Sequence, residues 1–201
     1  PMKLTVISPE ADDPRELLVL GQLFAHGLAD YHVRKPRWSR EELAAYLGRV
    51  PAEFHPRLVL HTHHELAREF PIGGLHERDE PGGTALVLGQ SLRRSCAVHD
   101  LARLRTALAH QDRVLFSPMF PSFSKPGRVP DPAVTAADLR AVLALPRRAE
   151  AIALGGIDAA RVAECRELGF DGVAVLGAVW RATSPVMAFL EMQQALPAHA
   201  H

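Results

Sequence analysis

Short apolar runs alternate along the chain with longer segments in which apolar residues recur every three or four positions. The runs fall at residues 3–8, 30–34, 57–61, 73–77, 94–97, 113–116, 150–154 and 172–176. Nearly continuous apolar strands are buried on both faces, which is typical of a parallel sheet covered by helices. Eight such repeats in 201 residues predict an α/β protein with one domain over residues 1–201, a (β/α)8 TIM barrel.

The main alternative is an open doubly wound sheet. That fold usually carries a glycine-rich turn after its first strand, and Ser8, Pro9 and Glu10 occupy this turn without a glycine. Residues that cap helices precede the expected helices, at Asp13, Ser39, Asp100, Thr135, Asp158 and Ser184. Residues 125–134 are rich in proline and are expected to form a long active-site loop, whereas residues 79–93 show no clear pattern.

Composition narrows the functional classes. The 23 basic and 23 acidic side chains cancel, so no broad field favours nucleic acid or an anionic membrane, and any anion site must be local. The chain shows no signal peptide and no run of about 18 apolar residues that would span a membrane. With two cysteines far apart in the sequence, a reducing cytoplasm is the expected location.

Polar residues gather where the expected strands end. In a barrel these ends surround one shared mouth, and the candidates there are Arg34, Lys35, His61, His63, His76, Glu77, Cys96, His99, Ser122, Ser124, Lys125, Gly155, Gly156 and Gly177. The set is cationic and rich in imidazole in a chain without net charge. It therefore favours an anionic small molecule, such as a phosphate ester, as the ligand.

The glycines and the sixth loop suit phosphate. Gly155, Gly156 and Gly177 follow the last two strands, where barrels often bind phosphate through backbone N–H groups; plain strand-to-helix turns are the alternative. Two hydroxyls and an ammonium, from Ser122 to Lys125, suit the oxygens of a phosphate or pyrophosphate, unless they form only a polar surface loop.

The basic residues after the second strand are also suited to binding an anion. Arg34 suits bidentate phosphate binding and Lys35 adds a point charge, while a solvated strand end is the alternative. Cys96 is expected to fill the barrel interior.

Four histidines are candidates for chemistry. His61 and His63 are two positions apart at the end of the third strand, so both are expected to point into the mouth beside His76. A zinc or iron site, substrate hydrogen bonding and a structural role remain open for them. His99 follows the fifth strand and is a candidate proton shuttle, with helix capping or packing as the alternative.

Three motifs together resemble the thiamine phosphate synthase and TenI superfamily. They are the Ser-Pro-Met-Phe-Pro-Ser-Phe-Ser-Lys loop at residues 117–125, the Leu-Gly-Gly-Ile at 154–157 and the Gly-Val-Ala-Val-Leu-Gly-Ala at 172–178. The resemblance implies a (β/α)8 barrel that joins hydroxymethylpyrimidine pyrophosphate to thiazole phosphate with Mg2+, and barrels of this kind often form homodimers. It also implies pyrophosphate binding by Arg34, Lys35, Ser122, Ser124 and Lys125, and thiazole phosphate binding by Gly156 and Gly177.

The sequence departs from this family at the metal-binding aspartates. The family's Asn-Asp pair aligns with His61 and Thr62, and its second aspartate aligns near Pro81, beside Asp79 and Glu80. Mg2+ is thus implied by resemblance only, and the metal ligands stay unassigned.

The TenI branch, a thiazole tautomerase, also lacks the aspartate and needs only proton transfer. Its acid/base histidine is replaced in the sixth loop, so His99 or His63 would supply the proton step. A barrel that binds the phosphate without catalysis, in a regulatory role, is the third hypothesis.

Overall fold

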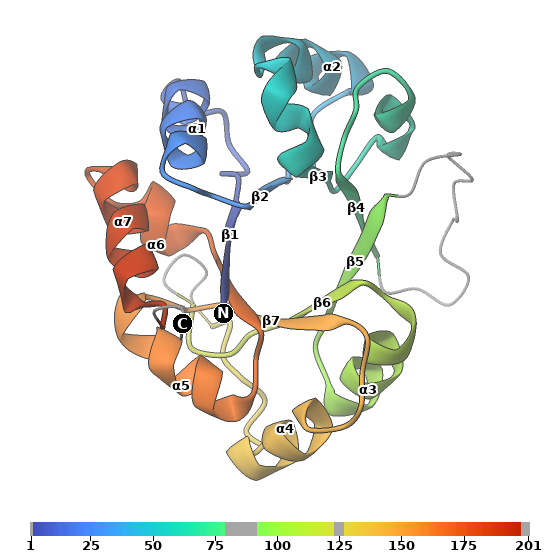
Figure 1. Ribbon diagram of the computed structural model, residues 1–201, viewed down its shortest axis with the longest axis vertical. Helices are drawn as coiled ribbons and strands as arrows, with labels where there is room; N and C mark the ends of the chain where they lie inside the picture. The colour runs from blue at the N-terminus through green and yellow to red at the C-terminus, as the bar shows by residue number, and fades with distance from the viewer. Residues whose placement is uncertain (1, 79–91, 123–126, 198–201) are drawn as a thin grey trace.

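Parallel strands close into a barrel at the centre of the molecule (Figure 1). The computed structural model describes residues 2–78, 92–122 and 127–197. In this part of the chain, eight strands pair in sequence order, and the last strand pairs with the first. They are β1 (Lys3–Ile7), β2 (Asp30–Val33), β3 (Leu58–Leu60), β4 (Gly74–Glu77), β5 (Arg93–Val98), β6 (Arg113–Phe116), β7 (Glu150–Leu154) and β8 (Gly172–Val175). The predicted (β/α)8 fold is confirmed.

Helices surround the barrel, and α7 lies beside α1 where the ring closes (Figure 1). The α-helices of the described residues are α1 (Glu16–Ala25), α2 (Arg40–Arg49), α3 (Leu101–His110), α4 (Ala136–Leu143), α5 (Val162–Leu168), α6 (Gly177–Trp180) and α7 (Pro185–Ala195). Short 3-10 helices are η1 (Ala52–Arg57), η2 (His64–Arg68) and η3 (Ala159–Arg161). No helix in the described ranges has the length and hydropathy needed to span a membrane.

Capping side chains start most of the helices where the sequence predicts. Ser39 and Thr135 each form a complete capping box, and the predicted caps at Asp100, Asp158 and Ser184 also accept backbone N–H groups. Asp13 is the exception, because α1 begins at Glu16 without a side-chain cap. The Asp13 carboxylate instead binds the Arg15 guanidinium at 2.8 Å and the Arg15 backbone N–H at 2.9 Å.

Two apolar layers fill the protein. The larger layer lies between the strands and the helices, and the smaller one, inside the barrel, consists of Ile7, Leu115, Ile152 and Ala174. Cys96 belongs to the outer layer, so its predicted place inside the barrel is wrong. Side chains alternate along a strand, and in β5 the inward positions belong to the neighbours of Cys96.

An ionic cluster occupies the amino-terminal end of the barrel. Asp30 on β2 accepts from Arg113 on β6 at 2.9 Å and pairs with Arg93 at 2.6 Å, while Arg113 also reaches Glu150 on β7 at 2.7 Å. Burial raises the pKa of Asp30, but the two guanidiniums outweigh it and hold this pKa below 3.8. The cluster ties four strands together, β2, β5, β6 and β7, at the end opposite the mouth.

Candidate active site

A cavity of about 290 Å³ opens at the carboxyl ends of the strands. Its floor is apolar, because Ile7, Leu115 and Ala174 of the inner layer line it. Backbone and polar side chains of the loops line its walls. A flat apolar ring with an anionic substituent matches a cavity with this floor and these walls.

One wall is built from the predicted glycines. Gly155, Gly156 and Gly177 all line the cavity. Gly155 and Gly156 have φ angles of +100° and +62°, and a Cβ on Gly156 would lie 2.3 Å from the carbonyl oxygen of Pro121. Glycine is required here because the loop after β6 folds directly onto the end of β7.

Backbone hydrogen bonds fix that contact. The N–H of Met119 donates to the carbonyl of Leu154 at 2.9 Å, and the N–H of Phe120 donates to the carbonyl of Gly155 at 3.0 Å. The β6 loop and the glycine turn are therefore one unit, and the loop carries Ser122 to the cavity.

Two arginines line the cavity. Arg34 follows β2 and forms an ion pair with Glu10, and its backbone N–H donates to the Ser8 hydroxyl at 2.7 Å. Arg128 follows the β6 loop, where its carbonyl accepts from the N–H of Ser122 at 3.0 Å. The cavity is thus locally cationic, as the sequence predicts, although Arg128 was not among the predicted residues. Ser124 and Lys125 lie outside the described residues.

Lys35 is directed away from the cavity into the layer of helices. Its side chain is 0% exposed, and its ammonium lies 2.5 Å from the Glu16 carboxylate and 2.7 Å from the Pro9 carbonyl. The Trp38 ring lies 4.8 Å from the same ammonium. Both residues follow β2, and these contacts make Lys35 a buried structural cation while Arg34 lines the cavity.

His63 also turns away from the mouth, so the expectation that it shares a face with His61 is wrong. β3 ends at Leu60, and His63 adopts a left-handed backbone with φ +50°. Its Nε2–H donates to the carbonyl of Trp38 at 2.8 Å. The two-residue period holds only inside a strand, and the chain has left the strand by this point.

His99 lines the same cavity as Arg34. Its Nδ1 lies 2.7 Å from the carbonyl oxygen of Ser117, so Nδ1 carries the proton and donates. The other nitrogen, Nε2, is then the basic atom of the ring. This arrangement suits a group that accepts or delivers a proton.

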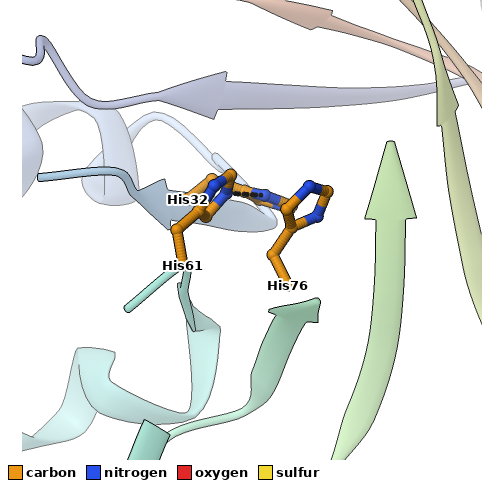
Figure 2. Close-up of side chains that lie close together, drawn as sticks. All are labelled: His32, His61 and His76. Carbon is orange, nitrogen blue, oxygen red and sulfur yellow. Dashed lines mark hydrogen bonds between the residues drawn. The ribbon is translucent and has the colours of Figure 1, made fainter. Parts of the chain in front are cut away.

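Three imidazoles meet beside the cavity (Figure 2). His32 comes from β2, His61 follows β3 and His76 lies on β4. His32 Nδ1 and His61 Nε2 are 2.9 Å apart, and the rings of His61 and His76 stack with centroids 4.1 Å apart. Burial, together with the neighbouring rings, lowers the pKa of His32 and His61 well below 6.5, and burial lowers that of His76 to about 3. All three rings are neutral near pH 7.

The residues of the cavity do not fit Mg2+, which takes oxygen ligands. Among the described residues that line it, Glu10 is the only carboxylate, and it is paired with Arg34. The family's Asn-Asp position is occupied by His61, and Asp79 and Glu80 lie outside the described residues.

The fold and this cavity define the class of the protein, a (β/α)8 barrel enzyme with its site at the carboxyl ends of the strands. Within that class, the chain belongs to the thiamine monophosphate synthase family, whose model matches residues 4–179. The thiamine-phosphate synthase of Bordetella pertussis is 31% identical over 194 residues, with 90% of this chain and 89% of the relative covered. That of Haemophilus influenzae is 27% identical, with 92% and 86% covered.

Solved structures agree with this assignment. A thiamine phosphate pyrophosphorylase from Bacteroides thetaiotaomicron superposes with a TM-score of 0.79 at 25% identity, covering 96% of this chain and 97% of the other. A 3-hexulose-6-phosphate synthase gives a TM-score of 0.69 at 17% identity, covering 98% and 100%. This second likeness concerns the fold alone.

Proposed function

We propose that this chain catalyses the thiamine-phosphate synthase reaction, a transfer that joins hydroxymethylpyrimidine pyrophosphate to thiazole phosphate and releases pyrophosphate. The observation that carries the proposal is the cavity, which combines an apolar floor, a glycine wall and a cationic wall. An apolar floor suits two heterocyclic rings, and the two walls suit two separate anionic groups.

The proposed roles follow the walls. Gly155, Gly156 and Gly177 hold the thiazole phosphate through backbone N–H groups, since all three line the cavity at the ends of the last two strands. Arg34 and Ser122 face the leaving pyrophosphate, where a guanidinium stabilises negative charge as the C–O bond breaks.

Other predicted residues enter the proposal differently. Ser124 and Lys125, outside the described residues, remain predicted pyrophosphate ligands, and Arg128 joins them because it lines the same cavity. Lys35 and His63 are left out because their side chains bind protein groups away from the cavity.

The test is an assay with both substrates, with and without Mg2+. Arg34→Gln should lower kcat/KM by about a hundredfold or more, as expected for loss of one group that stabilises developing charge. Arg37→Gln, three residues away on an exposed turn, is the matched control and should retain activity. Equal activity of the two variants, or no turnover by the unmodified protein, would refute the proposal. Lys125→Ala tests the part of the loop outside the described residues in the same way.

A thiazole tautomerase is the second candidate, and the geometry of His99 favours it. This activity needs a proton acceptor in the cavity, and the basic Nε2 of His99 is one. Isomerisation of a thiazole carboxylate phosphate without added metal, abolished in His99→Gln, would support it over the synthase. Tight binding of the phosphate with neither reaction would identify a non-catalytic, regulatory barrel.

The assembly and location of the protein are further proposals. Homodimers are expected, and sedimentation equilibrium would test this directly. A cytoplasmic location is supported by two cysteines, Cys96 and Cys165, that are both free and buried, since free thiols persist under reducing conditions.

A further inference from the structure

The cluster of His32, His61 and His76 is not explained by phosphate binding. One potential ligand atom from each ring lies within 4.8 Å of the others. The rings come from three neighbouring strands, so the convergence follows directly from the order of strands in the barrel (Figure 2). Three imidazoles rarely gather without a shared partner, because each needs a hydrogen-bond partner or a ligand for both nitrogens.

One ring is oriented by a neighbouring hydroxyl. The Ser95 hydroxyl donates to the carbonyl of Leu75 at 3.3 Å, so its oxygen accepts from Nδ1–H of His76 at 2.9 Å. This leaves the lone pair of His76 on Nε2. Histidines that bind metals are commonly fixed by such a hydrogen bond from the other ring nitrogen.

A second ring has an unsatisfied nitrogen. His32 is fully buried, and its Nε2 has no hydrogen-bond partner, although Nδ1 contacts His61 at 2.9 Å. The 2.9 Å contact joins two neutral ring nitrogens, of which only one can donate, so Nδ1 of His32 and Nε2 of His61 are the atoms that a common ligand would take. A small rotation that gives each of the two rings a common ligand would replace their mutual contact.

The spacing is close to that of a metal site. Tetrahedral zinc holds imidazole nitrogens at about 2.0–2.1 Å, which places them roughly 3.3 Å from one another. The nitrogens here are separated by at most 4.8 Å and in one pair by 2.9 Å. Shifts of about 1.5 Å or less, within reach of side-chain rotations, would bring all three to one ion.

We propose that His32, His61 and His76 form a site for a divalent transition metal of the zinc type, where the family's Asn-Asp pair aligns with His61 and Thr62. Imidazole suits Zn2+, Fe2+ and Ni2+, whereas Mg2+ prefers oxygen. Three protein ligands leave a fourth position open. His61 and His76 both line the cavity, so this position faces it.

The open coordination position suits an anionic fourth ligand. With Arg34 in the same cavity, an anionic oxygen of a phosphate ester is the fourth ligand that the site favours. This last point rests on the proposed function, whereas the metal site itself does not.

The experiment is a metal titration in the absence of substrate. The purified full-length protein is stripped with a chelator and titrated with Zn2+ by calorimetry, and with Co2+ by visible absorption, which reports four-coordinate geometry. One ion per chain is expected. His76→Gln and His61→Gln should each weaken zinc binding by more than a hundredfold, and Ser95→Ala by about 10- to 100-fold because it orients His76.

Matched controls separate the site from other histidines. His63→Gln, on the same segment but turned away, should leave the affinity unchanged. A chain with His199 and His201 both changed to glutamine should still bind one ion with the same affinity, which separates the site from the His-x-His tail. Thermal unfolding in chelator confirms that each variant folds.

Three outcomes would overturn the proposal. They are no saturable Zn2+ or Co2+ binding, equal affinity in His76→Gln and His63→Gln, and displacement of zinc by millimolar Mg2+. If zinc binds but neither thiamine-pathway substrate reacts, the proposed function fails while the metal site stands.

Discussion

Replacing Lys35 with methionine tests whether this cation is a structural group or a substrate ligand. The ammonium is fully buried and has three oxygen partners, and the Glu16 carboxylate also accepts from the hydroxyls of Tyr31 at 2.8 Å and Tyr46 at 2.9 Å. Lys35→Met keeps the length of the side chain but leaves Glu16 as a buried charge without a cation. Breaking one side of a buried ion pair costs about 3–5 kcal/mol.

The expected loss of stability can be measured by urea unfolding. With a urea m-value of about 2–3 kcal/mol/M, the loss shifts the unfolding midpoint by roughly 1–2.5 M. Tryptophan fluorescence reports the transition, because Trp38 lies against the ammonium. The double variant Glu16→Gln/Lys35→Met should recover part of the loss, since a neutral amide still accepts from the tyrosines.

The matched control is Lys3→Met, which removes the same group from an ion pair that is 45% exposed on its lysine side. Surface pairs contribute about 0–1 kcal/mol, so the midpoint should hardly change. If Lys35→Met cost no more than Lys3→Met, the ammonium would have to be hydrated. The reasoning would then fail, and Lys35 would return as a candidate phosphate ligand.

Three further predictions concern other parts of the fold. Gly156→Ala should lower the free energy of unfolding by at least about 1 kcal/mol, because the φ angle there is +62° and the new Cβ would lie 2.3 Å from a backbone oxygen. Gly21→Ala, on α1 where no atom lies within 4 Å of the new Cβ, should raise the free energy of unfolding slightly. The pKa of Asp30 is lower in the folded protein than in the unfolded chain, so the ionised carboxylate stabilises the fold above about pH 4 and this stabilisation is lost as the pH falls further. The midpoint of urea unfolding should therefore fall less steeply between pH 6 and pH 3 in Asp30→Asn than in the unmodified protein. Cys96 and Cys165 are buried, and burial raises the pKa of Cys165 to about 12, so a thiol reagent at pH 8 should label neither until the protein is unfolded.

Most of the fold was predictable because its signals are local. Each strand is an apolar run, and the capping boxes at Ser39 and Thr135 form between residues only three positions apart. The short helix α6 was missed, because its four residues are too few to show a helical period. The left-handed turn at His63 is accompanied by a hydrogen bond to the carbonyl of Trp38, 25 residues earlier in the chain, which no local pattern reveals.

The candidate site was predictable in part, and one signal was overlooked. His32 lies inside the apolar run of β2, so a histidine at this position pointed to the site. Arg34 and Lys35 follow β2, and the direction of Lys35 depends on its contacts with Glu16 and Pro9, which no local pattern reveals. Arg128 had no such signal, because its position depends on how the β6 loop folds back onto the glycine turn.

The two sides of the cavity depend on the sequence in different ways. At β7 and β8 the wall is backbone, and Gly156 is constrained by the loop packed on it, so few substitutions preserve the shape. At β2 to β4 the wall is made of side chains, which can be exchanged while the strands stay in place. The family's Asn-Asp pair aligns with His61 and Thr62 on this second side, where three imidazoles converge. The proposed zinc-type site would therefore combine a backbone wall whose shape is constrained at β7 and β8 with a side-chain wall at β2 to β4 that can take a different metal.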